Sequence, residues 1–490
     1  MFYREYLRNV TGNKNKINDY LEVKNNTLFY KEIDLLKLVK NYTDPLEVAY
    51  TPMIEDRILN IKKIVGEAIH RHNYPGTFTY AYASKANYFS EVITTALNGA
   101  DALEITSSYD LDIVEYLFKK KIISKDRLII CNGFKFDRYL TRLFYLKKQG
   151  LNLRPIVENL DELEALINGG LEFEIGLRLN VDEYPIKKSL LPPRLSSRSD
   201  TRFGLTFKEM LDTAKRLRNY PKLKFTTFHI HFGGMIEDIP SYVRAVKKIF
   251  VENYAEIKKI YPDLETLDLG GGLPVQYNLC FKFDYTKLFN DLIKTLGQTA
   301  KHANCRAPNL IGEYGRYTVN DHSFFIFKVI LEKSIPHRTA NWYIINGSIM
   351  THLPDSWALG QEFVVLPING WDRPGKLVRL GGITCDPDDT FHKNREMFLP
   401  EFSKDNELYI GVFGVGAYQE MISGIGGVHH CLLPEGCEVI IYKKDGRLVF
   451  DEITQKQTAK EVLNGLDYHS RHILGNYVQN PVTPALTLTK

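Results

Sequence analysis

The sequence predicts an α/β protein that consists of a closed (β/α)8 TIM-type barrel and a mainly β domain completed by N-terminal residues. Between about residues 76 and 314, eight short β-rich segments alternate with longer amphipathic segments. After about residue 320, strand-like segments punctuated by Gly and Pro replace this alternation. The length of 490 residues favours two or three domains over one simple core.

Repeated β-then-α units indicate the barrel. Apolar residues at three- and four-residue spacing predict helices between the strands, for example over 108–121 and 207–220. Parallel strands need crossover helices, so the repeat predicts a parallel sheet, and a count of eight favours a closed barrel over an open doubly wound sheet. The predicted strands are 78–84, 101–107, 127–133, 153–159, 173–181, 223–232, 264–271 and 309–314.

The flanking segments form the second domain. Residues 1–48 are expected to pack with the β domain, residues 49–320 to form the barrel, and residues 321–490 to form the β domain itself. The sequence KKDGR at 443–447 predicts a hairpin turn in that domain.

Composition excludes several classes of protein. The net charge of +4 is spread along the chain without a basic tract, so nucleic acid is not an expected partner. No apolar run approaches the ~18 residues of a membrane span. The six cysteines are scattered and the N-terminus has no apolar signal core, which favours a cytoplasmic protein with free thiols. No metal is expected.

Ionisable residues and glycines gather where the predicted barrel strands end, and these ends carry the catalytic residues of such barrels. Each has a bland explanation when taken singly. A lone lysine at a strand end is usually solvated, a lone buried histidine usually bonds a backbone carbonyl, and a glycine run is often only a turn. The residues are Lys85, Glu104, Arg178, His231, Gly270, Gly271, Gly272, Glu313 and Arg316.

Together these residues indicate a cofactor. Three successive glycines after the seventh strand can surround an anion with backbone N–H groups, and Arg316 can add a charged contact to the same phosphate. A lysine facing a phosphate site suggests a Schiff base to a phosphorylated aldehyde, which points to pyridoxal 5'-phosphate. Glu313 could hold the pyridine nitrogen of that cofactor protonated.

Nine ordered motifs resemble the alanine-racemase-like, barrel-type (fold type III) pyridoxal-phosphate decarboxylases, which include the ornithine, diaminopimelate and arginine decarboxylases. The resemblance implies decarboxylation of an amino acid to an amine and carbon dioxide. The motifs are SKAN, ALEITSSYDL, RLNV, DTRFGL, IHFGG, LDLGGGLP, GEYGRY, TCDPDD and GVGAY, between about residues 45 and 430.

The resemblance implies a role for each matching residue. Lys85 would form the Schiff base, His231 would stack on the cofactor ring, and Glu104 would support Lys85. Arg178 would orient the ring-binding network, and Arg202 would be a second cation near the substrate. The phosphate and ring nitrogen would be held by Gly271, Gly272, Arg316, Tyr418 and Glu313.

The TCDPDD motif implies a shared active site. Cys385 would reprotonate the substrate carbon, and Asp386 would meet the distal amine of the substrate. In this family the loop acts on the cofactor of the other subunit, so a homodimer is expected.

Departures from the family pattern bear on the substrate. Gly234 stands where the family often has a phosphate-binding serine, and Tyr314 replaces a usual proline. Residues 345–360 lack the arginine with which diaminopimelate decarboxylases bind a distal carboxylate. A diamino acid or a conjugated, more anionic derivative is therefore the expected substrate. Three arginines precede or enter DTRFGL, namely Arg194, Arg198 and Arg202.

Two alternatives stay open at this point. A pyridoxal-phosphate racemase would share the barrel and the lysine, although the TCDPDD motif favours decarboxylation. A non-catalytic regulator with a decarboxylase fold would be expected to have lost cofactor ligands that this chain keeps.

Overall fold

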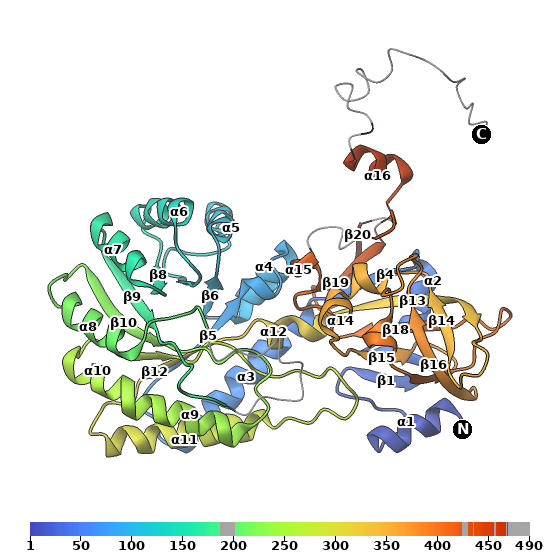
Figure 1. Cartoon of the computed structure of the whole chain (residues 1–490), viewed down its shortest axis with the longest axis horizontal. Helices are drawn as coiled ribbons and strands as arrows, with labels where there is room; N and C mark the ends of the chain where they lie inside the picture. The colour runs from blue at the N-terminus through green and yellow to red at the C-terminus, as the bar shows by residue number, and fades with distance from the viewer. Residues whose placement is uncertain (187–200, 424–429, 435, 455–456, 467, 469–490) are drawn as a thin grey trace, which may run out of the picture.

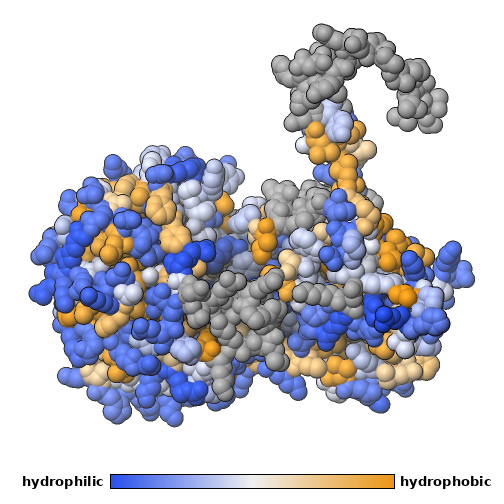
Figure 2. All heavy atoms as spheres, viewed as in Figure 1, coloured by the Kyte–Doolittle hydropathy of each residue, from blue (hydrophilic) through white to orange (hydrophobic). Residues whose placement is uncertain are grey.

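The computed structural model describes residues 1–186, 201–423, 430–434, 436–454, 457–466 and 468. Figure 1 shows two bodies side by side, with the helix-covered barrel on the left and the β domain on the right. The face drawn in Figure 2 carries mostly hydrophilic side chains over the barrel helices, with apolar ones scattered among them. None of the helices in the described part of the chain is long and apolar enough to cross a membrane.

The barrel contains all eight predicted strands, and the predicted fold class is confirmed. The strands are parallel, and the ring closes where β12 pairs with β5, which places Glu313 opposite Ala81. In sequence order the strands are β5 (Phe78–Ala83), β6 (Ala102–Ile105), β7 (Leu128–Cys131), β8 (Leu153–Val157), β9 (Phe173–Arg178), β10 (Leu223–His229), β11 (Thr266–Asp268) and β12 (Asn309–Glu313).

The alternation within β5 explains how this strand is buried on both faces. Ala81 belongs to a small apolar cluster formed only by residues of the barrel strands, whereas Tyr80 and Tyr82 belong to the large core that includes the surrounding helices. Small residues fit the barrel interior and large ones fill the layer between strands and helices. The strand is therefore buried from Tyr80 to Ala83, and Lys85 follows its C-terminal end.

The helices occupy the positions that the amphipathic segments predict, with one difference. The apolar spacing of residues 241–261 is that of one helix, but a π-helical turn at Phe250–Tyr254 interrupts it and places the buried Asn253 amide 2.7 Å from the hydroxyl of Tyr184. The helices are α3 (Pro52–Arg71), α4 (Ser90–Gly99), α5 (Ser108–Lys119), α6 (Asp137–Lys148), α7 (Leu160–Gly169), α8 (Phe207–Leu217), α9 (Ile239–Ile249), α10 (Ala255–Ile260) and α11 (Tyr285–His302).

The second domain is built on a nine-stranded sheet that takes one strand from the N-terminus. β4 (Leu46–Tyr50) lies between β13 and β19, so N-terminal residues complete this sheet as predicted. Asp445 and Gly446, both at positive φ, form the predicted hairpin turn. The other strands are β13 (Ser323–Lys333), β14 (Asn341–Ile345), β15 (Val364–Pro367), β16 (Gly375–Gly381), β17 (Met397–Pro400), β18 (Tyr409–Phe413), β19 (Cys437–Lys444) and β20 (Arg447–Thr454).

The first residues of the chain pack on this domain. The ring of Tyr3 lies 5.1 Å from that of Trp371, and the hydroxyl of Tyr30 donates to the carbonyl of Asp321 at 2.6 Å. The elements here are α1 (Tyr3–Thr11), β1 (Leu21–Lys24), β2 (Thr27–Tyr30), β3 (Ile33–Asp34) and α2 (Leu35–Asn41). The short helix α12 (Arg316–Val319) leads from the last barrel strand into the β domain.

Candidate active site

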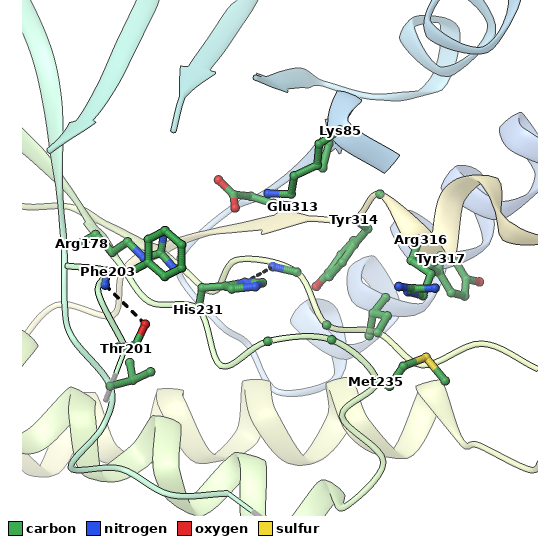
Figure 3. A pocket seen from close by; sticks show the side chains of 18 of the residues that line it. Lys85, Arg178, Thr201, Phe203, His231, Met235, Glu313, Tyr314, Arg316 and Tyr317 are labelled. Atoms are coloured by element: carbon green, nitrogen blue, oxygen red, sulfur yellow. Dashed lines mark hydrogen bonds between the residues drawn. The ribbon is translucent and has the colours of Figure 1, made fainter. Parts of the chain in front are cut away.

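A cavity of about 610 Å³ lies at the C-terminal ends of the barrel strands. This volume lies in the range of small-molecule and cofactor sites. Residues that follow five different strands line the cavity, and Figure 3 shows several of them pointing into it. Among the lining residues are Lys85, Arg178, His231, Gly271 and Glu313.

Lys85 lies in a short 3-10 turn, Ser84–Ala86, directly after β5. Its Nζ lies 3.2 Å from Oε1 of Glu104, which extends from β6. The lysine side chain keeps 39% exposure, whereas the glutamate is fully buried. Burial favours a lower pKa for Lys85, but the charge of Glu104 and the next acidic groups outweigh it and raise the pKa overall.

Asn132 connects the two glutamates of the site. Its Nδ2 donates to Oε1 of Glu104 and to Oε1 of Glu313, each at 2.8 Å. The residue directly follows β7, so the rule that assigns catalytic residues to strand ends could have found it. Sequence analysis missed Asn132 because it considered ionisable side chains and glycines.

The two glutamates differ in their ionisation. Burial raises the pKa of Glu104, the charge of Lys85 lowers it and Glu313 raises it, which leaves a pKa of about 7. For Glu313, burial is outweighed by His229, whose Nε2 lies 3.5 Å away, and then by Lys85, so its pKa falls to about 2. Glu313 is therefore the carboxylate that stays charged at neutral pH.

Asp268 is a third buried acid near these glutamates, and its pKa is also shifted. Burial and the nearby charge of Glu313 raise the pKa of Asp268 well above its ordinary value. Its Oδ1 accepts the backbone N–H of Gly270 at 2.9 Å. His229 and Asp268 are the last residues of β10 and β11, and sequence analysis missed both.

His231 follows β10 and points into the cavity (Figure 3). Burial, followed by the charges of Arg178 and Lys85, lowers its pKa well below the ordinary value, so the imidazole is neutral. Its Nδ1 accepts the backbone N–H of Gly271 at 3.3 Å, which fixes the ring next to the glycine loop.

Two arginines flank one aromatic ring at the cavity. The guanidinium groups of Arg178 and Arg202 lie 4.6 Å and 4.5 Å from the ring centre of Phe203. Arg178 also donates to both carboxylate oxygens of Glu158, at 3.0 and 3.1 Å. Glu158 was missed by sequence analysis. Arg194 and Arg198 lie outside the described residues.

The glycine loop after β11 approaches the backbone too closely for any side chain. A Cβ added at Gly271 would lie 2.6 Å from the carbonyl oxygen of Glu313. One added at Gly272, where φ is +116°, would lie 2.6 Å from the carbonyl oxygen of Gly233. A Cβ at Gly234, by contrast, would meet nothing within 4 Å.

The β domain reaches the cavity through Tyr418. Its backbone N–H donates to the carbonyl of Ala86 at 2.8 Å, immediately beside Lys85. The guanidinium of Arg316 lies 4.6 Å from the centre of the Tyr418 ring and donates to the hydroxyl of Tyr277. Tyr277, which sequence analysis missed, therefore holds Arg316 in place.

Cys385 and Asp386 are not among the described residues that line this cavity. Both lie in the loop that follows β16, near His430 and Cys431. Within one chain the structure therefore brings together the residues expected to hold the cofactor, but not these two.

Comparison with known proteins identifies the family. Residues 62–320, more than half of the chain, match the family described as pyridoxal-dependent decarboxylase, pyridoxal binding domain. The chain belongs to this family. The protein is a pyridoxal-phosphate-dependent enzyme that decarboxylates an amino acid, as the motifs implied. This assignment favours decarboxylation over racemisation and over a non-catalytic role.

The similar proteins agree with this assignment along almost the full length of the decarboxylase. The biosynthetic arginine decarboxylase of Geobacter sp. (strain M21) is 24% identical over 578 aligned positions, which cover 93% of this chain and 88% of that protein. The crystal structure of the biosynthetic arginine decarboxylase SpeA from Campylobacter jejuni has a TM-score of 0.80 at 21% identity, covering 98% and 96% of the two chains. Diaminopimelate decarboxylase from M. jannaschii, in complex with L-lysine, has a TM-score of 0.72 at 21% identity, covering 92% and 98%.

The residues of this decarboxylase fit pyridoxal phosphate. An amine, a strongly acidic carboxylate and a glycine loop that tolerates no Cβ all face one cavity. Arg316 also lines the cavity and can add a cation to the phosphate group.

Proposed function

We propose that this decarboxylase acts on a basic amino acid whose distal group is cationic, in active sites shared by the two subunits of a homodimer. The observation that carries the catalytic half of the proposal is the buried chain of contacts from Lys85 through Glu104 and Asn132 to Glu313. This chain links the amine that would bind the cofactor to the carboxylate that would bind its ring nitrogen.

Each residue of that chain has a distinct task. Bound pyridoxal phosphate supplies an electron sink for the pair of electrons left when carbon dioxide departs. Glu313, charged at neutral pH, would keep a proton on the ring nitrogen. Glu104 accepts a hydrogen bond from Nζ of Lys85 at 3.2 Å, so it would orient that amine. His231, a neutral flat ring, would cover one face.

The phosphate end would be held by backbone and cation together. Gly271 and Gly272 line the cavity without side chains, so their backbone would be able to approach a phosphate closely. Arg316 supplies a charge whose position Tyr277 and Tyr418 fix. Water would be excluded from this end by Tyr314, which is buried and lines the cavity.

The substrate preference follows from charge. Residues 345–360 contain no arginine to bind a distal carboxylate, whereas Asp386 offers a carboxylate to a distal cation. The arginine decarboxylase relatives make arginine the first candidate, followed by the diamino acids ornithine and lysine. A conjugated, more anionic derivative is a second candidate, favoured by Arg202 at the cavity.

The shared site rests on the position of the TCDPDD loop. Because Cys385 and Asp386 do not line the cavity of their own chain, a second subunit is the natural source of the thiol that reprotonates the substrate carbon. The thiol acts here as an acid, so it needs a reducing compartment such as the cytoplasm.

Carbon dioxide release from a panel of amino acids tests the proposal. Arginine, ornithine, lysine, meso-diaminopimelate and citrate-conjugated diamines should be compared with wild-type protein and the Lys85→Ala variant. We expect release from a basic amino acid and none from Lys85→Ala, whereas Lys208→Ala on the exposed face of α8 should behave as wild type. Equal activity on meso-diaminopimelate would contradict the assignment of a cationic distal group.

A further inference from the structure

A second group of reactive side chains lies outside the cavity. Sγ of Cys385 lies 3.4 Å from Sγ of Cys431 and 3.7 Å from Nδ1 of His430, and Sγ of Cys431 lies 3.6 Å from the same nitrogen. Two sulfurs and one imidazole nitrogen thus form a nearly equilateral triangle. Cys385 and His430 are exposed and Cys431 is partly exposed, so solvent and ions can reach the triangle.

The size of the triangle suits a metal ion. A tetrahedral Zn²⁺ with bonds of about 2.3 Å to sulfur and about 2.1 Å to nitrogen separates two sulfurs by about 3.8 Å, and sulfur from nitrogen by about 3.6 Å. The three observed distances are close to these values. A disulfide between Cys385 and Cys431 would instead require their sulfurs to approach to about 2.05 Å.

The surroundings of His430 also resemble those of a metal ligand. Its Nε2 lies 3.5 Å from Oδ2 of Asp386, on the side of the ring opposite the sulfurs. A carboxylate at one ring nitrogen keeps the proton there and leaves the other nitrogen free to bind a metal. Asp386 is therefore placed to orient the ring, with Nδ1 on the side of the two thiols.

A backbone hydrogen bond also fixes the second thiol. The backbone N–H of Cys385 donates to Sγ of Cys431 at 3.3 Å. This contact holds the sulfur of Cys431 next to the sulfur of Cys385, 3.4 Å away.

We propose that Cys385, His430 and Cys431 bind a divalent transition-metal ion of the zinc class, with one coordination position open to water. Each bound thiol gives its proton to solvent, so the metal forms two bonds to sulfur and one to nitrogen. The inhibitory consequence rests on the proposed function. A metal on Cys385 removes the thiol proton that the substrate carbon would receive, so the occupied enzyme should be inhibited.

The sequence alone did not reveal this site. Cys385 and Cys431 lie 46 positions apart and show none of the close Cys spacing that marks zinc motifs. Only the fold brings the loop after β16 next to the His430–Cys431 pair.

Cobalt binding tests the site independently of activity. Reduced, metal-free holoenzyme is titrated with Co²⁺, which gives sulfur-to-metal charge-transfer absorption in proportion to the number of thiolates bound, and Zn²⁺ is then added in competition. We expect one ion per subunit, with the absorption reduced to about half by C385S or C431S. H430A should weaken binding at least tenfold and D386N about tenfold.

The matched control is C280S, which removes an exposed free cysteine elsewhere in the chain and should leave the absorption unchanged. The proposal is wrong if Co²⁺ gives no charge-transfer band, or if C385S and C431S bind as wild type does. It is also wrong if the reduced protein binds no metal but peroxide joins Cys385 to Cys431, because the pair would then be a redox couple.

Activity separates this inference from the proposed function. Stoichiometric Zn²⁺ should suppress carbon dioxide release by wild-type protein at least tenfold, and a chelator should restore it. The ratio of rates without and with zinc should approach one in C431S. Full occupancy without inhibition would overturn the inhibitory role and the assignment of Cys385 as proton donor, but not the decarboxylase function that Lys85→Ala tests.

Discussion

The amide nitrogen of Asn132 lies 2.8 Å from a carboxylate oxygen of Glu313, and it reaches Glu104 at the same distance. Two buried acids with a pKa of about 7 and about 2 are thus held by one neutral donor. The difference between them comes from their other neighbours, because His229 contacts only the second acid.

Asn132→Ala should destabilise the protein and weaken cofactor binding. Two buried carboxylates would lose a hydrogen-bond donor, at a cost of about 2–3 kcal/mol in the free energy of unfolding. Urea unfolding of the cofactor-free protein and titration with pyridoxal phosphate measure the two effects. Asn98→Ala, at an exposed position of α4, is the control. Equal stability of Asn132→Ala and Asn98→Ala would show that the hydrogen bonds from Asn132 to Glu104 and Glu313 contribute nothing to stability.

Glu104→Gln should change how stability depends on pH. The folded-state pKa of about 7 lies above the ordinary value of 4.5, so the protonated carboxyl is favoured in the folded protein. Its stabilising contribution is present below about pH 4.5 and is lost as the pH rises through 7. Glutamine does not titrate, so the variant should not show this loss, which amounts to about 3 kcal/mol in the free energy of unfolding above pH 7.

Denaturant midpoints of the cofactor-free protein at pH 5 and pH 8 provide the measurement for Glu104→Gln. The midpoint should fall less between these pH values in the variant than in wild type. Parallel pH profiles would mean that Glu104 does not carry the raised pKa.

Gly234→Ser and Gly271→Ser should have opposite effects on cofactor affinity. A side chain at Gly234 enters open space beside the glycine loop, and a new hydroxyl donor to phosphate is worth about 1 kcal/mol, or roughly fivefold tighter binding. A side chain at Gly271 would collide with the backbone of Glu313. Absorbance titration with pyridoxal phosphate distinguishes them, and weaker binding by Gly234→Ser would contradict the placement of the phosphate.

Mixing two inactive variants tests the shared active site. If Lys85 and Cys385 act on one cofactor from different subunits, Lys85→Ala and Cys385→Ala chains should each be inactive alone. Random reassociation would then restore about a quarter of wild-type activity, because half of the dimers carry one intact site. Size-exclusion chromatography should show a dimer. No recovery in mixed dimers would place both residues in the same subunit's site.

The barrel could be predicted from the sequence because its apolar residues recur at the regular spacing of strands and helices. Eight strands and most of their helices follow from apolar spacing, and Lys85, His231, Glu313 and the glycine loop follow from the rule that strand ends carry function. The strand β17 lacks such a signal, and it forms because β16 offers it an antiparallel partner. Tertiary pairing, rather than local pattern, decides such a segment.

The residues that sequence analysis missed share a different property. Asn132, Glu158 and Tyr277 act on other side chains, so their importance depends on which residues the fold places beside them. His229 and Asp268 end β10 and β11, and their importance comes from their contacts with Glu313 and Gly270. The strand-end rule marks such positions, but a single sequence does not show which partners the residues contact.

The position of β4 has a consequence for how the chain folds during its synthesis. This strand is made before any part of the barrel, yet both of its partners, β13 and β19, come from the far side of the barrel sequence. On the ribosome, β4 must wait with both hydrogen-bonding edges open until β13 has been made, and its second edge stays open until β19 follows more than a hundred residues later. A fragment that begins at residue 321 would lack this strand and leave the same two partners exposed.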